Sequence, residues 1–182
     1  GLLDLKKLPF ILPPLQEQRK IASILGAWDA AISKLEKLIT EKEALKKGLM
    51  QQLFTGKKRF PGFTDEWKEV ALMEVGTFLK GKGIAKSEMQ KVGRPAVRYG
   101  ELYTVHHDRI KAFHTYISSE SAANSKKIIS GDILFAGSGE TLDEIGKCAA
   151  FIDKDEAYAG GDIIILRPSL EIESIFLAFV LN

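Results

Sequence analysis

The sequence has few of the residues that stabilise extracellular proteins or anchor proteins in membranes. Its 182 residues include one cysteine, Cys148, so no disulfide can form within the chain, and a reducing cytoplasm is the expected location. No apolar run approaches the roughly 20 residues that a membrane-spanning helix needs. Hydrophobic residues make up 45% and charged residues 27%, as in a soluble folded protein. These features exclude a protein held together by internal disulfides and favour a folded cytoplasmic protein.

Side-chain combinations typical of catalytic or metal centres are also missing from the sequence. No Ser-His-Asp, Cys-His or metal-ligand constellation is visible, and the adjacent His106 and His107 would point to opposite faces of a strand. A Gly-Ser-Gly loop followed by a Gly-Lys pair suggests a phosphate-binding loop. However, six residues separate Gly139 from Gly146, and Cys148 stands where the Walker pattern requires Ser or Thr. We therefore expect no metal, no nucleotide and no other cofactor.

Proline is absent from Leu15 to Phe54, and this stretch has the apolar pattern of a long helix. Its apolar residues recur every seven residues in three series, which form one broad stripe. Such a helix would be about 60 Å long, twice the width of a small domain, so the stripe needs a partner helix of similar length. A core helix in a bundle is the alternative, but the only other helical pattern is short. We expect pairing through Ile21, Leu25, Trp28, Ile32, Leu35, Ile39, Leu49 and Leu53.

After Trp67 the apolar pattern changes to that of short strands separated by glycine-bearing or polar turns. An apolar helix is expected at Ile172–Leu181. The sequence therefore predicts an α+β protein, with a long coiled-coil helix followed by a mainly β domain that contains short helices. Strands are expected at Val70–Leu72, Pro95–Tyr99, Thr115–Ile117, Asp132–Ala136, Cys148–Ile152 and Ile163–Leu166.

Basic residues concentrate in one part of the chain, although its formal net charge is only +2. Residues 80–114 carry 8 basic and 3 acidic side chains, whereas residues 115–182 carry 5 basic and 11 acidic ones. Such a block suggests an anionic partner, although plain solvated surface can have the same composition. The connection Phe78–Arg94 holds three glycines and five cations. It is either a flexible surface loop or a loop that grasps a nucleic-acid backbone.

Several segments resemble those of type I restriction–modification specificity subunits. The segment LPPLQEQRKIASIL at Leu12–Leu25, with the long helix after it, resembles the spacer of that family. The downstream runs GKGIAK, RPAVRYGEL, SGDILFAGSGET and GGDIIILRP resemble the opening of a target recognition domain. The resemblance implies that the β domain reads one part of a split DNA site and that the helix sets the distance to the second part. It also implies that the Gly-Ser-Gly-Glu-Thr loop belongs to the DNA-recognition fold.

The family resemblance also implies which activities belong to other subunits and how this chain divides into domains. The chain itself would not be an enzyme, because adenine methylation and DNA cleavage would come from separate methyltransferase (M) and restriction (R) subunits. Residues 1–13 would close a target recognition domain, residues 14–55 would form the spacer helix, and residues 56–182 would form a target recognition domain.

The order of these parts departs from the family pattern, in which two recognition domains are each followed by a spacer helix. The chain is expected to be either a fragment of a larger subunit or a circularly permuted half-subunit. In either case its helix would pair in antiparallel fashion, with a second copy or with a second half-subunit.

Candidate DNA contacts lie mainly in the basic block. Lys80, Lys82 and Lys86 are expected to touch phosphates because the glycine-rich backbone allows close approach. Arg98, Tyr99, Ser138 and Glu140 are expected to read bases, although each could be buried structure instead. Arg94 and Arg109 complete the predicted set. Two rivals remain: a coiled-coil adaptor whose β domain binds protein, and an enzyme that uses carboxylates such as Asp132, Glu140 and Asp143.

Overall fold

The structure, a computed structural model, describes residues 5–182 and divides after Trp67 into two compact units. Residues 1–4, part of the expected closing segment 1–13, lie outside the described residues. The division predicted from the sequence, at residues 55 and 56, stays a prediction. Each unit is described below by itself.

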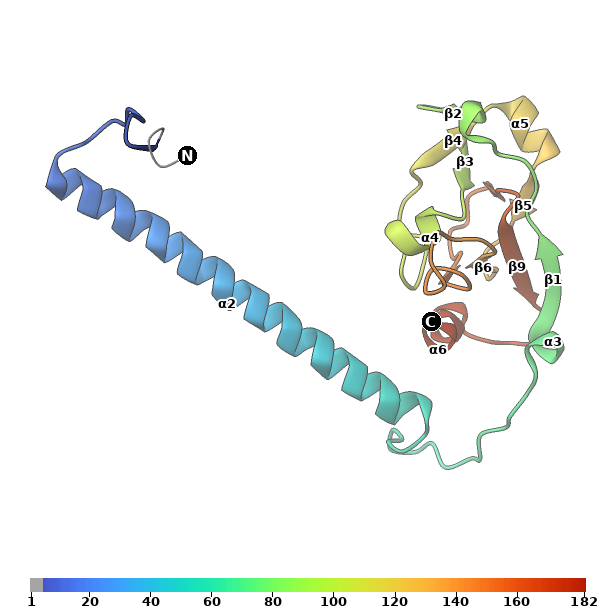
Figure 1. Cartoon of the computed structure of the whole chain (residues 1–182). Helices are drawn as coiled ribbons and strands as arrows, with labels where there is room; N and C mark the ends of the chain where they lie inside the picture. The colour runs from blue at the N-terminus through green and yellow to red at the C-terminus, as the bar shows by residue number, and fades with distance from the viewer. Residues whose placement is uncertain (1–4) are drawn as a thin grey trace. The chain divides into compact units, whose positions relative to one another are not determined.

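The first unit contains helix α2, Leu15–Phe54, which has the 40 residues that the sequence predicts (Figure 1). It begins directly after Pro14, and the side-chain amide of Gln18 donates a hydrogen bond to the carbonyl of Pro13 at 2.7 Å. It ends at Phe54, with Thr55 as its C-cap, because Gly56 adopts a left-handed conformation with φ of +68°. The next residues fold back on this end, where Trp67 packs on Gly56 and the Arg59 guanidinium lies 4.9 Å from the Trp67 ring centroid.

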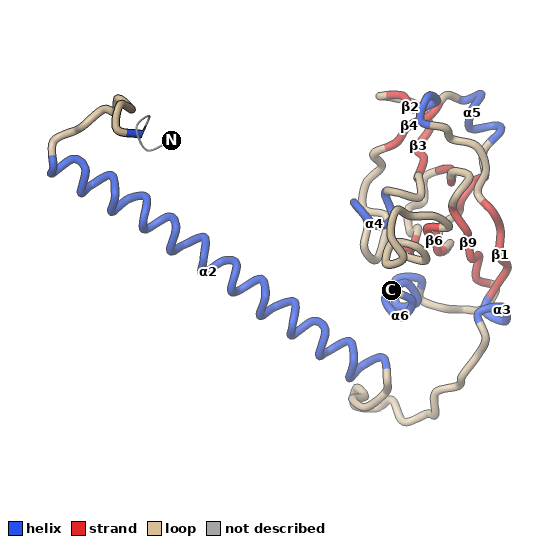
Figure 2. The backbone as a smooth tube through the Cα atoms, viewed as in Figure 1, coloured by secondary structure: helices blue, strands red, loops and turns tan. Residues whose placement is uncertain are grey.

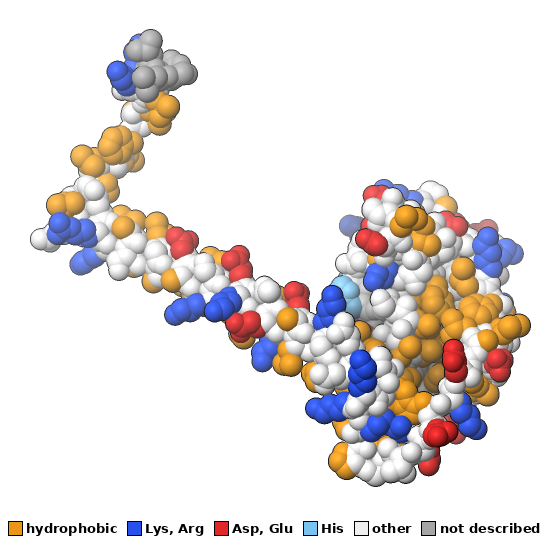
Figure 3. Space-filling model, turned by 60° about the horizontal axis from the view of Figure 1, so that its bottom comes forward, with side chains coloured by type: hydrophobic (Ala, Val, Ile, Leu, Met, Phe, Trp, Pro, Cys, Tyr) orange, Lys and Arg blue, Asp and Glu red, His pale blue; other side chains and the backbone are white. Residues whose placement is uncertain are grey.

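None of the residues of α2 is buried in this single chain. Leu25 is 58% exposed, Trp28 66% and Leu35 59%. Hydrophobic side chains are visible between the charged ones along the helix surface (Figure 3). A helix of this length is stabilised in water mainly by packing of its apolar face, and in the single chain this face is exposed.

The second unit contains two sheets connected by many loops (Figure 2). The first sheet is antiparallel and has the order β1-β9-β6-β7, formed by β1 (Gly76–Lys80), β9 (Ile163–Pro168), β6 (Ile133–Ala136) and β7 (Cys148–Ala150). The second has the order β2-β4-β3-β8-β5. Its strands are β2 (Met89–Gln90), β4 (Thr115–Ile117), β3 (Arg94–Val97), β8 (Ala157–Ala159) and β5 (Lys126–Ile128). Only the β3–β8 pair is parallel among these described pairings.

The main core lies between the two sheets. Leu134 and Ile165 of the first sheet belong to one buried cluster with Val97 and Ile128 of the second. Because side chains alternate along a strand, the neighbouring Ile133 and Leu166 point to the other face of the first sheet. There they pack under helix α6 (Ser174–Leu181). Helix α5 (Ser119–Asn124) contributes Ala122 to a third cluster on the second sheet.

The predicted α+β class is confirmed, but one expected strand is wrong. Val70 and Ala71 lie in a loop, and Leu72 begins the short helix α3 (Leu72–Val75). The strand follows it as β1, so Lys80 lies at a strand end and not in a loop. Three further strands, β2, β5 and β8, were not predicted from the sequence.

The missed strands share a physical explanation. β1, β2 and β5 are edge strands with at most one fully buried side chain each, so none of them has a clear apolar run. β8 lies inside its sheet but has the sequence Ala-Tyr-Ala, without the branched residues typical of strands. These segments are therefore strands because they pair with neighbouring strands, and their own sequences do not predict them.

Candidate nucleic-acid interface

Three glycine-containing loops interlock at one edge of the second unit. Gly81 N donates to Ile163 O at 2.7 Å, Gly161 N to Gly83 O at 2.9 Å, and Gly137 N to Asp162 O at 2.8 Å. A Cβ on Gly81 would lie 1.9 Å from the carbonyl oxygen of Gly160, so only glycine permits this approach. We call residues 81–88, 137–139 and 160–162 the loop platform.

Local contacts fix the first of these loops. Ile84 has φ of +65°, which is unfavourable for a β-branched residue. Its side chain is buried in the cluster with Ala96 and Ile117, and this packing holds the backbone in place. Two residues on, in the short 3-10 helix η1 (Lys86–Glu88), the Glu88 carboxylate accepts a hydrogen bond from Ala85 N at 2.6 Å, which lowers the pKa of Glu88.

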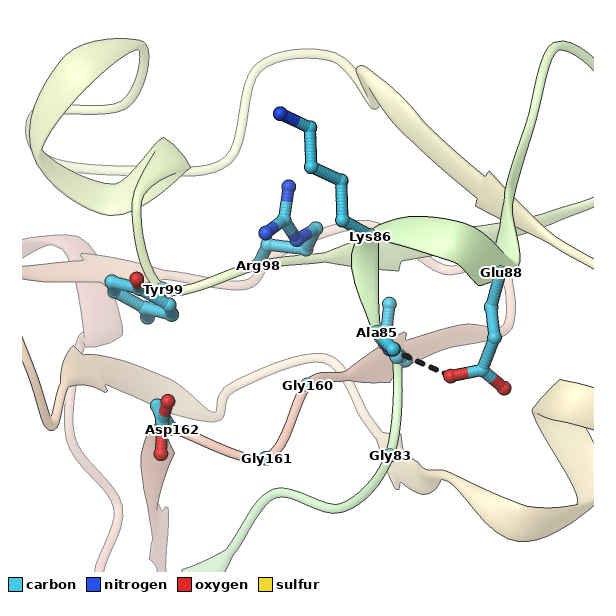
Figure 4. Close-up of a pocket in the computed structure, with 10 residues that line it drawn as sticks. Gly83, Ala85, Lys86, Glu88, Arg98, Tyr99, Gly160, Gly161 and Asp162 are labelled. Carbon is cyan, nitrogen blue, oxygen red and sulfur yellow. Dashed lines mark hydrogen bonds between the residues drawn. The ribbon is translucent and has the colours of Figure 1, made fainter.

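A pocket of about 410 Å³ opens between the platform and the end of β3. Lys86, Arg98, Tyr99 and Asp162 line it, and Figure 4 shows Lys86 and Arg98 on one side with Tyr99 and Asp162 on the other. The Arg98 guanidinium donates to the Met89 sulfur at 3.4 Å, a weak acceptor that leaves most of its donors free. The pocket therefore offers cationic donors, an aromatic ring and two carboxylates, those of Asp162 and Glu88.

A second hollow of about 410 Å³ adjoins Asp162. Its lining includes Phe78 and Lys80 of β1, Gly137 of the platform, and Ile164 of β9. Asp162 lines both hollows: Lys86, Arg98 and Tyr99 share the first with it, and Lys80 shares the second.

The loop after β6 is closed by its own side chains. The Glu144 carboxylate accepts hydrogen bonds from Glu140 N at 2.7 Å and Thr141 N at 3.1 Å. A carboxylate that occupies these amides prevents them from binding a phosphate, which agrees with the rejection of a Walker loop. The Ser138 hydroxyl oxygen is enclosed and has no hydrogen-bond partner among the described residues. Glu140 remains exposed.

This loop also lies near a pair of tyrosines. The ring centroids of Tyr99 and Tyr103 are 6.4 Å apart. Burial raises the pKa of Tyr103, and the negative charge of Glu144 adds to this effect. Tyr99 therefore lines the first pocket and also lies beside Tyr103, which is close to the loop after β6.

Five of the nine predicted contacts line neither hollow, namely Lys82, Arg94, Arg109, Ser138 and Glu140. Arg94 starts β3 opposite Ile117, and Arg109 lies 3.8 Å from the neighbouring Asp108. Neither lines the two hollows. Lys82 is exposed on the platform, between Gly81 and Gly83. Asp162 was not among the predicted residues; its position after a Gly-Gly pair and before an apolar strand was the only available signal.

The carboxylates of the rival enzyme hypothesis are not grouped in one cleft. Asp132 precedes β6 and is fully buried, where Arg167 donates to both of its carboxylate oxygens at 2.9 and 2.8 Å. Glu140 and Asp143 lie beyond the other end of β6 and are exposed. Asp132 is thus part of a buried ion pair and is not grouped with the other two carboxylates.

The histidines occupy different environments after helix α4 (Glu101–Thr104). His106 is buried and His107 is exposed. Within residues 5–182, no group of three or more His, Cys, Asp or Glu side chains could hold a metal ion. In the same range, no helix is long and apolar enough to cross a membrane.

Sequence comparisons match parts of the chain to one family. Residues 2–47 match the sequence model of the type I restriction modification DNA specificity domain. The chain is 35% identical over 91 residues to the type I restriction enzyme MjaVIII specificity subunit of Methanocaldococcus jannaschii, which covers 45% of this chain and 21% of that protein. It is 47% identical over 52 residues to the putative type I restriction enzyme MjaX specificity subunit of the same organism, covering 29% and 12%. The chain thus spans about a fifth or less of the curated relatives' length.

Solved structures share the fold. The HsdS subunit from Thermoanaerobacter tengcongensis matches with a TM-score of 0.53 and 22% identity, over 93% of this chain and 41% of that one. The type I restriction–modification S subunit from M. genitalium matches with a TM-score of 0.55 and 17% identity, over 91% and 41%. Parts of the chain are thus similar in sequence to type I restriction–modification specificity subunits, and its fold is similar to that of two solved S subunits.

Proposed function

We propose that this chain gives DNA sequence specificity to a type I restriction–modification complex. The β domain reads one half of a bipartite DNA site, and helix α2 spaces it from a second recognition domain. Methylation and cleavage come from partner M and R subunits, and the complex works in the cytoplasm. The proposed domains are residues 1–13, 14–55 and 56–182.

The observation that carries this proposal is the loop platform. Backbone hydrogen bonds join the loops that carry Lys82 and Lys86, Arg98 lines the same hollow as Lys86, and Lys80 lines the adjoining one. Cations that are held in place on exposed loops contact phosphates, and neighbouring donors read base edges. The similarity of parts of the chain to type I specificity subunits supports the same function. No comparable observation favours a protein-binding adaptor.

The phosphate contacts are tested by changing Lys80, Lys82 and Lys86 to Ala in the full chain. Each lost contact should lower the slope of log affinity against log salt by about one, and binding should weaken equally for all duplex sequences. The measurement is a titration of labelled duplexes at several salt concentrations.

A matched control is Lys154→Ala, which removes an exposed cation from the turn between β7 and β8. It should change the salt slope by much less than the triple variant does. If the triple variant kept the full salt slope, the platform would not contact phosphates. If the unmodified chain showed no salt-dependent binding at all, the proposed function would be wrong.

A further inference from the structure

Asp162 is a carboxylate that lines two hollows together with basic side chains. It is exposed, and no side chain in the described part of the chain lies within ion-pair distance of its oxygens. It lines both hollows of the interface, beside Arg98 and Tyr99 in one and Lys80 in the other. In the close-up of Figure 4, its carboxylate lies on the Tyr99 side of the pocket.

The backbone of Asp162 is held from both sides. Its carbonyl accepts the hydrogen bond from Gly137 N at 2.8 Å, and the next residue, Ile163, is fully buried and donates to Gly160 O at 3.2 Å. Aspartate has a short side chain with few rotamers, so the position of the carboxylate is largely fixed by this backbone. Precise placement of this kind is what direct reading of a base edge requires.

An unpaired carboxylate weakens binding to a phosphate backbone, because like charges repel. Its presence among Lys80, Lys86 and Arg98 therefore opposes general DNA affinity. A group can weaken binding to every sequence by repulsion and still form a hydrogen bond with only one of them. Such a group widens the difference in affinity between that sequence and all others. In the major groove, the exocyclic amino group of cytosine is a donor that Asp or Glu accepts, and the paired guanine presents acceptors that Arg recognises.

We infer that Asp162 is a specificity-determining residue that accepts a hydrogen bond from the amino group of a cytosine. Arg98, across the same pocket, donates to the guanine of that base pair. This inference rests on the proposed function, and it adds to it a residue and a preferred C·G base pair.

The inference is tested by selecting bound duplexes from a library with randomised sequence, using the unmodified chain and two variants. Asp162→Ala removes the acceptor, so the preference for cytosine at one base pair should fall about tenfold while the other positions keep theirs. Asp162→Asn should shift that position toward adenine, which asparagine recognises through paired hydrogen bonds. Both variants should bind non-specific duplex more tightly than the unmodified chain does.

Glu171→Gln is the control, because it removes an exposed carboxylate beyond the opposite end of β9. It should leave the selected motif unchanged. If the unmodified chain selects a motif and both Asp162 variants select the same one, the inference fails and the proposed function stands. If the unmodified chain selects no motif, the proposed function fails and the inference fails with it.

Discussion

At the scale of single residues, the strongest electrostatic contact is the pair of Asp132 and Arg167. Asp132 is completely buried and also accepts a hydrogen bond from Ile129 N at 2.9 Å. Changing Arg167 to Met would leave this charge without its partner. The free energy of unfolding should fall by about 3 to 5 kcal/mol, as measured by urea unfolding at pH 7.

The double variant Asp132→Asn with Arg167→Met should recover part of this loss, because no unpaired charge remains buried. Arg109→Met is the control, since Arg109 is exposed and its contact with Asp108 is long. It should change stability by less than about 0.5 kcal/mol. Equal losses in the Arg167 and Arg109 variants would contradict the structural role of the buried pair.

His106 makes stability depend on pH. Its side chain is 1% exposed, and neither ring nitrogen has a hydrogen-bond partner within residues 5–182. Burial lowers the pKa of His106 below its ordinary value of 6.5, and this outweighs the opposite effect of Glu101. The unfolded chain therefore binds a proton more readily than the folded one, so this contribution to stability is present above pH 6.5 and is lost as the pH falls below it.

His106→Leu should reduce the loss of stability between pH 7 and pH 5.5, because the buried titrating group is gone. The test is urea unfolding at the two pH values for this variant, the unmodified chain and His107→Gln. His107 is exposed and is the smallest of the causes that lower the pKa of His106, so its replacement should alter the pH dependence much less than His106→Leu does. An unchanged pH dependence in His106→Leu would disprove the role of His106.

At the scale of elements, the exposed stripe of α2 predicts helix pairing. The expected contacts are those of Ile21, Trp28, Leu35, Ile39 and Leu49, all exposed in the single chain. Changing Leu35 and Ile39 to Asp would place charges in the seam, at a cost of several kcal/mol, so dimers should dissociate. Light scattering gives the oligomeric state.

The matched control puts two Asp residues on another face of the same helix, as Lys34→Asp with Lys37→Asp. These positions lie outside the apolar series, so the dimer should survive. A folded monomer for the unmodified chain would contradict pairing between copies of this chain.

The elements differ in how far the sequence could predict them. Helix α2 was predicted at its observed ends because its signals are local: prolines before it, a heptad pattern within it and Gly56 after it. The strand expected at Val70–Leu72 was wrong because an apolar triplet fits a helical turn as well as a strand. The platform depends on hydrogen bonds between residues about 80 positions apart, such as Gly83 and Gly161, which no local pattern predicts.

At the scale of the whole molecule, the length of α2 predicts the spacing of the DNA site. An antiparallel pair would hold two recognition domains at opposite ends of a rod about 60 Å long, which corresponds to one to two turns of DNA. Because a dimer of this chain would read both halves with the same domain, its motif should be symmetric and interrupted.

Seven residues inserted after Glu36 keep the heptad register and lengthen the rod by about 10 Å. The two half-sites should stay the same, and the gap between them should widen by about three base pairs. Selection from libraries with variable gaps measures this. If the insertion variant folds, dimerises and still prefers the original gap, α2 serves only for pairing.

The sequence by itself determined the long helix, the mainly β second unit, the family resemblance and the basic segment that supplies Lys80, Lys86 and Arg98. These features can be recognised from periodicity and composition, which are properties of short stretches of the sequence. Only the tertiary structure decided that Asp132 is a buried structural ion and that Asp162 is an exposed one. Both are aspartates that precede apolar strands, and they differ because Arg167 reaches one of them across the sheet while nothing among the described residues pairs with the other.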